Sequence, residues 1–280
     1  MRLVRSNEAS FAHSLGNKNT VRKFERMNTH YPKQKIMVVM PAYNAEKTLT
    51  RTYHDIPRDV VDEIILVDDG SHDSTVELAR KLGLTVVVHP QNRGYGGNQK
   101  TCYTMALNAG ADIIVMIHPD YQYDPKLLPA LVRPIIDERA DIMFGSRIRT
   151  REEALHGGMP LYKYLGNRLL TLVENIILGQ NLSEYHTGFR AFHRVVLQRL
   201  PFHNFSDDFV FDQDIVISAV REGFRIGEIP VPVSYFADAS SINFSRSVKY
   251  GFQIFGGLFL YVLDATHLYR SKIFAKKEKK

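Results

Sequence analysis

A carboxylate and an amide follow an apolar run near the middle of the chain. Residues 113–117 read Ile-Ile-Val-Met-Ile, and Asp120 and Gln122 follow in the next five residues. Such a run is typical of a buried strand, and open α/β sheets bind ligands at the carboxyl ends of their strands. Side chains at positions i and i+2 can face one hard cation, so Asp120 and Gln122 are candidate metal ligands.

Three further turns follow apolar runs and carry side chains that suit a nucleotide. They are Pro41-Ala42-Tyr43-Asn44, Val67-Asp68-Asp69-Gly70-Ser71 and Gly145-Ser146-Arg147. Tyr43 offers a ring for a base, Asp69 a carboxylate for ribose hydroxyls or a cation, and Arg147 a guanidinium for phosphate. The sequence has neither Gly-x-Gly-x-x-Gly nor Gly-x-x-x-x-Gly-Lys-Ser/Thr, so a glycine-rich phosphate loop is not expected.

Alternating strands and helices would bring these turns together. Strands are predicted at 35–40, 62–68, 84–89, 112–117 and 141–145, and helices at 45–56, 75–82, 97–109 and 125–138. Asn44 is a predicted N-cap, and Gly83 ends the second helix. Helices at 160–178 and 212–222 and strands at 188–193 and 225–233 follow. This order predicts an α/β fold with a central, mostly parallel sheet flanked by helices, on one edge of which the turns open.

The size of the chain and its single cysteine bound the fold and the location. With 280 residues, 44% of them hydrophobic, the chain can form one large domain with appendages. Cys102 is the only cysteine, which excludes an intramolecular disulfide and suits a reducing, cytoplasmic compartment. Residues 1–30 show no apolar run typical of a secretory signal.

The formal net charge of +6 is concentrated at the two ends. Residues 1–35 carry +6 and residues 270–280 carry +5, which leaves −5 for residues 36–269. We therefore predict a flexible basic extension over 1–34, a basic tail over 270–280, and no nucleic-acid partner. The basic ends either lie against anionic lipid or are simply solvated.

An apolar segment precedes the basic tail. Residues 254–263 are uninterrupted apolar or glycine residues, half of the roughly 20 needed to span a bilayer. The segment 237–269 is therefore predicted as a helical appendage. It either lies in the membrane interface, which makes the protein peripheral on the inner face of the membrane, or packs on the domain.

Seven motifs in order give the chain a familiar pattern. They are Val38-Val39-Met40-Pro41-Ala42-Tyr43-Asn44, Val67-Asp68-Asp69-Gly70-Ser71, Asn92-Arg93-Gly94, Asp120-Tyr121-Gln122, Gly145-Ser146-Arg147, Glu184-Tyr185-His186-Thr187-Gly188-Phe189-Arg190-Ala191-Phe192 and Phe209-Val210-Phe211-Asp212-Gln213-Asp214. This pattern resembles family 2 glycosyltransferases of the GT-A fold, especially the polyprenyl-phosphate mannose and glucose synthases. The resemblance implies a glycosyltransferase domain over 35–236.

The resemblance implies a role for several residues. Nucleotide contacts fall on Pro41, Ala42, Tyr43, Val67 and Asp69. Asp120 and Gln122 would bind Mg²⁺ or Mn²⁺, and Arg147 would lie beside a donor or acceptor phosphate.

The implied reaction moves a hexose from UDP- or GDP-hexose to a polyprenyl phosphate with inversion. Asp120 and Arg147 would act in catalysis. Asp212 or Asp214 would serve as base only for a hydroxyl acceptor. Arg190 either binds phosphate or pairs with Glu184.

One departure from the family pattern keeps other functions open. His118 stands where the family usually has a first Asp, so one negative charge beside the metal is missing. The alternatives are transfer to a saccharide or small-molecule hydroxyl and a catalytically impaired protein that only binds nucleotide sugar. A nucleotidyltransferase would need a basic glycine-rich loop after the first strand, which Pro41-Ala42-Tyr43-Asn44 is not.

Overall fold

The computed structural model describes residues 33–148, 150–156, 159–232 and 244–274. Nearly all of the predicted extension over 1–34 lies outside these residues, as do 233–243 and the end of the basic tail. From Lys35 onward the chain forms one compact unit.

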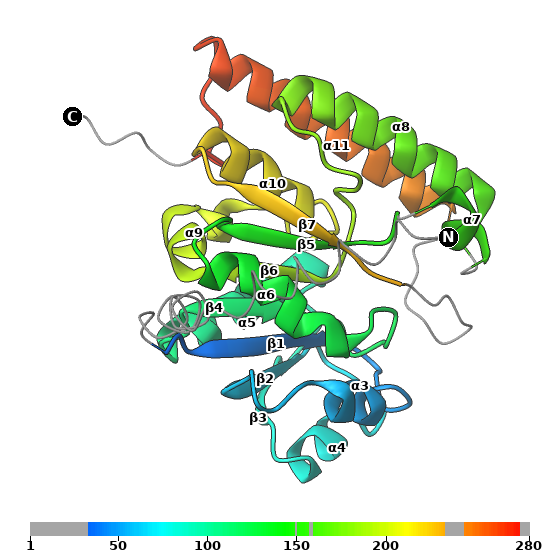
Figure 1. Cartoon of the computed structure of the whole chain (residues 1–280), viewed down its shortest axis with the longest axis vertical. Coiled ribbons are helices and arrows are strands. Elements are labelled where there is room, and N and C mark those ends of the chain that lie inside the picture. Colours follow the sequence, from blue (N-terminus) through cyan, green and yellow to red (C-terminus); the bar gives the residue numbers. More distant parts are fainter. Residues whose placement is uncertain (1–32, 149, 157–158, 233–243, 275–280) are drawn as a thin grey trace, which may run out of the picture. The chain divides into compact units, whose positions relative to one another are not determined.

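A seven-stranded sheet organises this unit (Figure 1), in the order β3-β2-β1-β4-β6-β5-β7. The strands are β1 (Ile36–Ala42), β2 (Glu63–Asp68), β3 (Thr85–Val88), β4 (Ile113–Met116), β5 (Ile142–Ser146), β6 (Arg190–His193) and β7 (Ile226–Pro230). Only β6 runs antiparallel to its neighbours. The prediction of an α/β fold with a mostly parallel sheet is confirmed.

The strands are apolar on both faces because helices cover both sides of the sheet. In β1, Met37 and Val39 belong to one buried cluster, and Val38 and Met40 to the other. The first cluster includes side chains of α5 (Tyr95–Asn108), α8 (Leu161–Leu178), α9 (Arg194–Arg199), α10 (Phe211–Arg221) and α11 (Phe244–Ala265). The second includes those of α3 (Leu49–Asp55), α4 (Thr75–Lys81) and α6 (Leu128–Ile136).

Several predicted boundaries need correction. The helix predicted from residue 45 begins at Leu49, and Asn44 is not its cap. Asn44 has a φ of 52°, and its side-chain oxygen accepts a hydrogen bond from the His72 N–H instead. The strand predicted from 188 begins at Arg190, and the helix predicted from 125 opens with a 3-10 turn. The sequence did not predict α7 (Arg151–His156) or α9.

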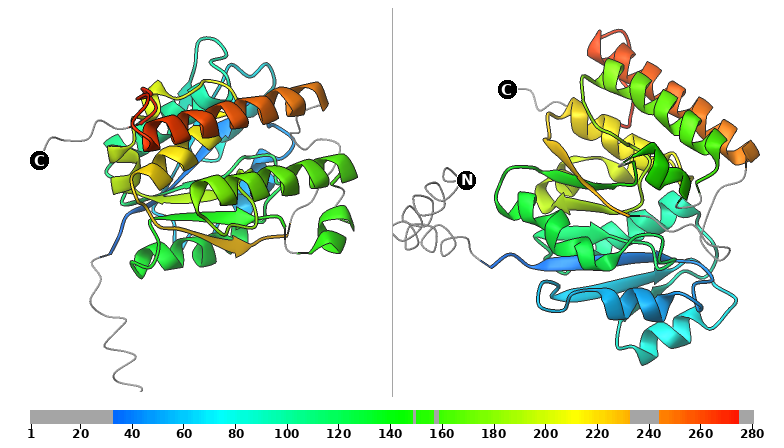
Figure 2. Two further views of the ribbon diagram at one scale, coloured as in Figure 1. Left: turned by 90° about the horizontal axis from the view of Figure 1, so that it is seen from above. Right: turned by 45° about the vertical axis from the view of Figure 1, so that its right-hand side comes forward.

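Two long helices pack together on one side of the sheet. In Figure 2, α11 is the orange-to-red helix and α8 a green one, and α11 contacts both α8 and α10. Ile254 and Leu258 of α11 enter the buried cluster, whereas Phe252 and Phe259 are exposed. The apolar segment thus packs on the domain and also keeps an exposed apolar face. Across the described residues, we find no helix with the length and apolar character required to cross a membrane.

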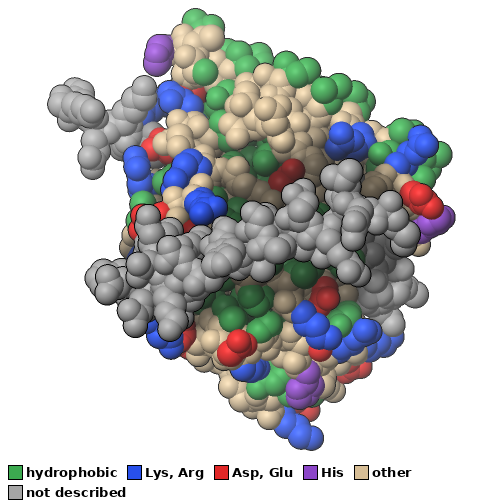
Figure 3. All heavy atoms as spheres, viewed as in Figure 1, with side chains coloured by type: hydrophobic (Ala, Val, Ile, Leu, Met, Phe, Trp, Pro, Cys, Tyr) green, Lys and Arg blue, Asp and Glu red, His purple; other side chains and the backbone are tan. Residues whose placement is uncertain are grey.

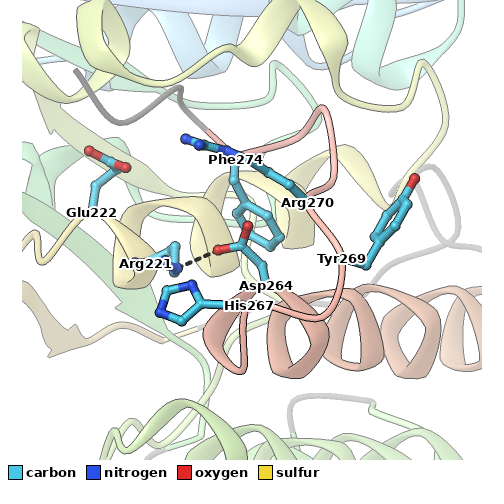
Figure 4. Close-up of a pocket in the computed structure, with 7 residues that line it drawn as sticks. All are labelled: Arg221, Glu222, Asp264, His267, Tyr269, Arg270 and Phe274. Atoms are coloured by element: carbon cyan, nitrogen blue, oxygen red, sulfur yellow. Dashed lines mark hydrogen bonds and ion pairs between the residues drawn. The ribbon is translucent and has the colours of Figure 1, made fainter. Parts of the chain in front are cut away.

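A partly buried ion pair anchors the end of α11 to α10. The Arg221 guanidinium donates from Nε to Asp264 Oδ2 at 2.6 Å, beside a small cavity of about 160 Å³ (Figure 4). Asp264 is the only acid on α11, and Arg221 already neutralises it. This ion pair is therefore explained by helix packing.

Candidate active site

A cleft of about 1220 Å³ opens over the carboxyl ends of β1, β2, β4 and β5. Eight predicted site residues line it: Pro41, Ala42, Tyr43, Asp69, Asp120, Gln122, Arg147 and Asp212. The first halves of α8 and α11 contribute the rest of one wall. Val67, Arg190 and Asp214 are not among its lining residues.

The ends of β1 and β2 are tied together by side chains behind the cleft. Asn98 on α5 donates to the Val67 carbonyl oxygen at 3.0 Å, so the Val67 backbone holds α5 against the end of β2. Asp68 accepts from the backbone N–H groups of Gly70 and Ser71, so it shapes the turn. Tyr43, on the turn after β1, is 52% exposed and lines the cleft, so its ring is accessible to a ligand.

Asp69 organises the loop that follows β3. Its Oδ1 accepts from the Arg93 N–H at 2.9 Å and lies 2.7 Å from His89 Nδ1, and its Oδ2 accepts from the Gly94 N–H at 3.1 Å. Asp69 is therefore almost fully buried, although it lines the cleft. No sequence pattern pointed to His89, which is 20 residues away along the chain.

Asp120 and Gln122 lie on the turn after β4 and both line the cleft. Tyr121 between them has a φ of 57°, and Asp120 Oδ1 accepts from the Gln122 N–H at 3.1 Å, which holds the carboxylate in place. The described residues contain no cluster of three or more His, Cys, Asp or Glu that could hold a metal. Two oxygen donors nevertheless fit Mg²⁺, which commonly takes one or two carboxylates with phosphates and water.

His118 belongs to the cleft wall and not to a carboxylate pair. Its Nε2 lies 3.2 Å from the Tyr95 hydroxyl, and the two rings stack with centroids 5.4 Å apart. A Cβ on Gly188 would come within 2.8 Å of the His118 ring, so only glycine fits there. No motif in the sequence indicated that Tyr95 would reach the centre of the site.

Asp212 is held by three neighbours at the cleft wall. Tyr95 donates its hydroxyl to Oδ2 at 2.8 Å, and Gln99 donates to Oδ1 at 3.1 Å. The Arg190 guanidinium lies 3.6 Å from Oδ2. Burial, and secondly the Asp212 charge, raise the pKa of Tyr95 well above its usual value, so Tyr95 stays a neutral donor.

The structure corrects the expectation that Arg190 either binds phosphate or pairs with Glu184. Arg190 is 0% exposed and pairs with Asp212. Its remaining bonds go to the carbonyl oxygens of Thr187, Tyr185 and Asp212, at 2.7, 3.0 and 3.1 Å. Arg190 thus positions the wall of the cleft.

Asp214 points away from the site. Its Oδ2 accepts from the Ser206 N–H at 2.9 Å, and burial raises its pKa to about 6. Of the two candidate bases, only Asp212 reaches the cleft.

Arg147 is fixed by a buried carboxylate while it lines the cleft. Its backbone N–H and Nε donate to Glu184 at 2.7 and 2.8 Å, and Nη2 donates to Glu184 and to the His186 carbonyl. Asn167 of α8 donates at 2.9 Å to Glu184 Oε1, the oxygen that also accepts from Arg147 Nε. Glu184 therefore couples the turn after β5 to α8.

The sheet with one antiparallel strand and a cleft at its carboxyl edge define the GT-A class of nucleotide-sugar transferases. The chain matches the family described as glycosyl transferase family 2 over residues 37–200, and it belongs to that family. It is a glycosyltransferase, as the sequence motifs predicted.

Two named relatives are similar over most of their length. The UDP-N-acetylglucosamine–dolichyl-phosphate N-acetylglucosaminyltransferase of Methanococcus voltae is 29% identical, over 79% of this chain and 93% of that protein. The polyprenol monophosphomannose synthase of Mycolicibacterium smegmatis is 27% identical, over 71% of this chain and 77% of that protein. An uncharacterised protein of Methanocaldococcus jannaschii is 32% identical, over 79% and 90%.

The fold has a solved counterpart. Glucosyl-3-phosphoglycerate synthase from Mycobacterium tuberculosis, in complex with Mn²⁺, UDP-glucose and phosphoglyceric acid, superposes with a TM-score of 0.64. The two chains are 22% identical, and the match covers 85% of this chain and 81% of the other. The likeness confirms the GT-A fold.

Proposed function

We propose that the protein transfers a hexose from UDP- or GDP-hexose to a polyprenyl phosphate, with inversion at the anomeric carbon, on the cytoplasmic surface of a membrane. One observation carries this proposal: the cleft continues into an exposed apolar face formed by α8 and α11. Tyr162, Leu169, Val248 and Phe255 belong to both.

This two-helix apolar face consists of large side chains at helical spacing. Its members are Leu161, Tyr162, Leu165, Leu169, Leu172 and Ile176 of α8, and Val248, Phe252, Phe255, Phe259 and Val262 of α11. Figure 3 shows hydrophobic side chains along the upper right edge, where α8 lies in Figure 1. Burying one such side chain contributes about 1.5–3 kcal/mol, so a few of them can hold a protein at a bilayer.

The charges around this face suit an anionic membrane. The only acids of α8 and α11 are Glu174 and Asp264, and both are buried. Exposed cations stand on these two helices or shortly after α11 in the chain: Arg168, Arg246, Arg270 and Lys272. Each basic residue near an anionic surface contributes about 1 kcal/mol. The names of the Methanococcus voltae and Mycolicibacterium smegmatis relatives also support a polyprenyl-phosphate acceptor.

In the proposed reaction, an acceptor phosphate oxygen forms a bond to the anomeric carbon of the donor. At the same time the bond between that carbon and the nucleoside diphosphate breaks, and the nucleoside diphosphate leaves. Asp120 and Gln122 would hold Mg²⁺ or Mn²⁺, which when bound neutralises charge on the leaving diphosphate. Tyr43 and Asp69 line the cleft and would contact the base and the ribose of the donor. The Arg147 guanidinium would stabilise phosphate charge at the cleft.

The environment of Asp212 favours an anionic acceptor over a hydroxyl. Tyr95 and Gln99 donate to the two Asp212 oxygens, and the Arg190 guanidinium lies 3.6 Å away, so these contacts hold the carboxylate in the cleft wall. A phosphate acceptor is already ionised and needs no general base, whereas a hydroxyl acceptor would need one. A carboxylate with this positioning role therefore suits the phosphate acceptor better than the saccharide or small-molecule alternative.

Transfer assays with labelled UDP- and GDP-hexoses test this function directly. We expect a lipid-linked sugar when polyprenyl phosphate is present in anionic vesicles, and its loss on addition of EDTA. Formation of a soluble glycoside alone would contradict the proposed acceptor. Nucleotide binding without any transfer would support the alternative suggested by His118, a catalytically impaired protein that only binds nucleotide sugar.

A further inference from the structure

His186, in the loop before β6, contacts both helices of the two-helix apolar face and the turn after β5. Its Nε2 lies 3.1 Å from Glu174 Oε2 on α8, and its Nδ1 lies 3.1 Å from the Tyr250 hydroxyl on α11. The His186 and Tyr250 rings meet edge to face with centroids 5.5 Å apart. The His186 carbonyl oxygen accepts from Arg147 Nη2. Since His186 and Tyr250 both line the cleft, these side chains connect a buried carboxylate to the candidate active site.

Glu174 decides which nitrogen of His186 carries the ring proton. The carboxylate is 0% exposed, and no described group donates a well-aligned hydrogen bond to either of its oxygens. Among the described residues, His186 is its only ion-pair partner. A lone pair on Nε2 would face these oxygens and be repelled, so the proton of the neutral ring is assigned to Nε2. Nδ1 is then a hydrogen-bond acceptor.

Tyr250 supplies the proton that Nδ1 accepts. Burial, and secondly the charge of Asp212, raise the pKa of Tyr250 above its usual value, so the hydroxyl stays protonated. Its one proton is used in the bond to His186, and its oxygen lone pairs remain for a ligand. Tyr250 therefore presents a hydrogen-bond acceptor to the cleft.

An acceptor at this position suits a sugar hydroxyl and not a phosphate. The charges that act on Tyr250 include those of Asp212 and Arg147, which belong to α10 and to the turn after β5. Tyr43 and Asp69 instead follow β1 and β2, in the other half of the sheet. An ionised phosphate has no proton to donate, whereas a hexose hydroxyl has one. In transfer to a phosphate acceptor, the hydroxyls at the reacting centre belong to the hexose.

We propose that the Tyr250 oxygen accepts a hydrogen bond from a hydroxyl of the donor hexose, and that Glu174 and His186 are positioning residues that orient it. The inference rests on the proposed function and deepens it, because it names a residue that recognises the transferred sugar. Helix α11 thereby serves both the apolar face and the sugar.

Titration calorimetry on the full chain with Mn²⁺ present compares UDP-glucose and GDP-mannose with UDP and GDP. For the nucleotide sugar that wild type binds, we expect Tyr250→Phe to weaken binding roughly 3- to 10-fold, the loss expected for one neutral hydrogen bond. Affinity for the corresponding diphosphate should not change. Tyr261→Phe, on the same helix and outside the residues that line the cleft, is the matched control and should bind both ligands like wild type.

Variants of Glu174 test the positioning role. Glu174→Gln keeps an oxygen that can accept from His186 Nε2 and should retain the affinity for nucleotide sugar, whereas Glu174→Leu should show the same loss as Tyr250→Phe. Combining Glu174→Leu with Tyr250→Phe should cost nothing further, because both act through one hydroxyl. Thermal unfolding records any effect on the fold separately. Wild-type affinity in a folded Glu174→Leu variant would overturn the positioning role.

The outcomes separate this inference from the proposed function. Equal affinity of wild type and Tyr250→Phe for the nucleotide sugar overturns the inference, whereas transfer to polyprenyl phosphate by both would keep the function. Equal losses for nucleotide sugar and diphosphate would place Tyr250 at the nucleotide and also overturn it. Weaker binding of citronellyl phosphate to Tyr250→Phe, with donor binding unchanged, would overturn it in favour of a contact with the acceptor. If neither nucleotide sugar binds wild type, the inference and the function both fail.

Discussion

Arg190 and Asp212 form an ion pair at 3.6 Å directly behind the wall of the cleft. The guanidinium on β6 is fully buried, and the carboxylate in the first turn of α10 faces the site. The pair therefore joins the antiparallel strand to the helix that borders the cleft. Its role is to hold the wall in place.

Replacing Arg190 should damage the fold more than it damages ligand binding. Arg190→Met leaves a buried carboxylate without its partner, and breaking such a pair costs about 3–5 kcal/mol. Urea unfolding should show this loss in the free energy of unfolding. Nucleotide affinity of the folded variant, measured by calorimetry, should stay near wild type. A stable variant that no longer binds nucleotide would instead support the hypothesis that Arg190 binds phosphate.

Asp120→Asn should abolish metal-dependent transfer. The amide keeps the shape of the side chain and its contact with the Gln122 N–H, but it removes the charge that attracts a cation. Transfer measured across a Mn²⁺ titration should remain near background. Near wild-type turnover with Mg²⁺ or Mn²⁺ would exclude Asp120 as the ligand.

Asp69→Ala should weaken both nucleotide binding and local stability. The substitution removes the acceptor for two backbone N–H groups and for His89. Each lost charge-assisted bond costs about 1.5–3 kcal/mol. Calorimetry with UDP and GDP, together with thermal unfolding, measures the two effects. Unchanged affinity for the nucleotide that wild type binds would remove Asp69 from the site.

The raised pKa of Asp214 predicts a specific pH dependence of stability. With a folded pKa of about 6 against an ordinary 3.8, the native state holds a proton that the unfolded state releases. Stability from this group is therefore lost as pH rises from about 4 to 6, by about 3 kcal/mol. Asp214→Asn should lack this loss, so the difference in unfolding free energy between wild type and variant should change across that window. A constant difference from pH 4 to 7 would contradict the assignment.

Charges placed on the two-helix apolar face should release the protein from vesicles. Leu172 and Ile176 belong to this face and do not line the cleft. The double variant Leu172→Glu and Ile176→Glu should sediment far less with anionic liposomes, while its nucleotide affinity is unchanged. High salt should weaken wild-type sedimentation, because the exposed cations on and after these helices are screened.

A control places one negative charge on an exposed apolar residue outside the two-helix apolar face. Val195→Glu, on α9, should sediment like wild type. Equal and negligible sedimentation of wild type with anionic and neutral liposomes would refute the peripheral-membrane hypothesis and favour a soluble acceptor.

Much of the architecture was encoded locally. Apolar runs such as 36–40 and 113–117 predicted strands because residues buried on both faces of a parallel sheet must all be apolar. The turns after those runs necessarily share one edge when their strands are parallel. The amino-acid sequence alone therefore sufficed to gather Pro41, Tyr43, Asp69, Asp120 and Arg147 at one cleft.

Contacts between distant segments decided the rest. Asp212 and Asp214 lie about 200° apart on a helix, so only one can face the cleft, but the packing of α10 determines which. The partner of Arg190 is 22 residues away and on another element. The apolar stripe of α8 is present in the sequence, yet only the tertiary structure leaves it exposed, because α11 packs beside it and does not cover it.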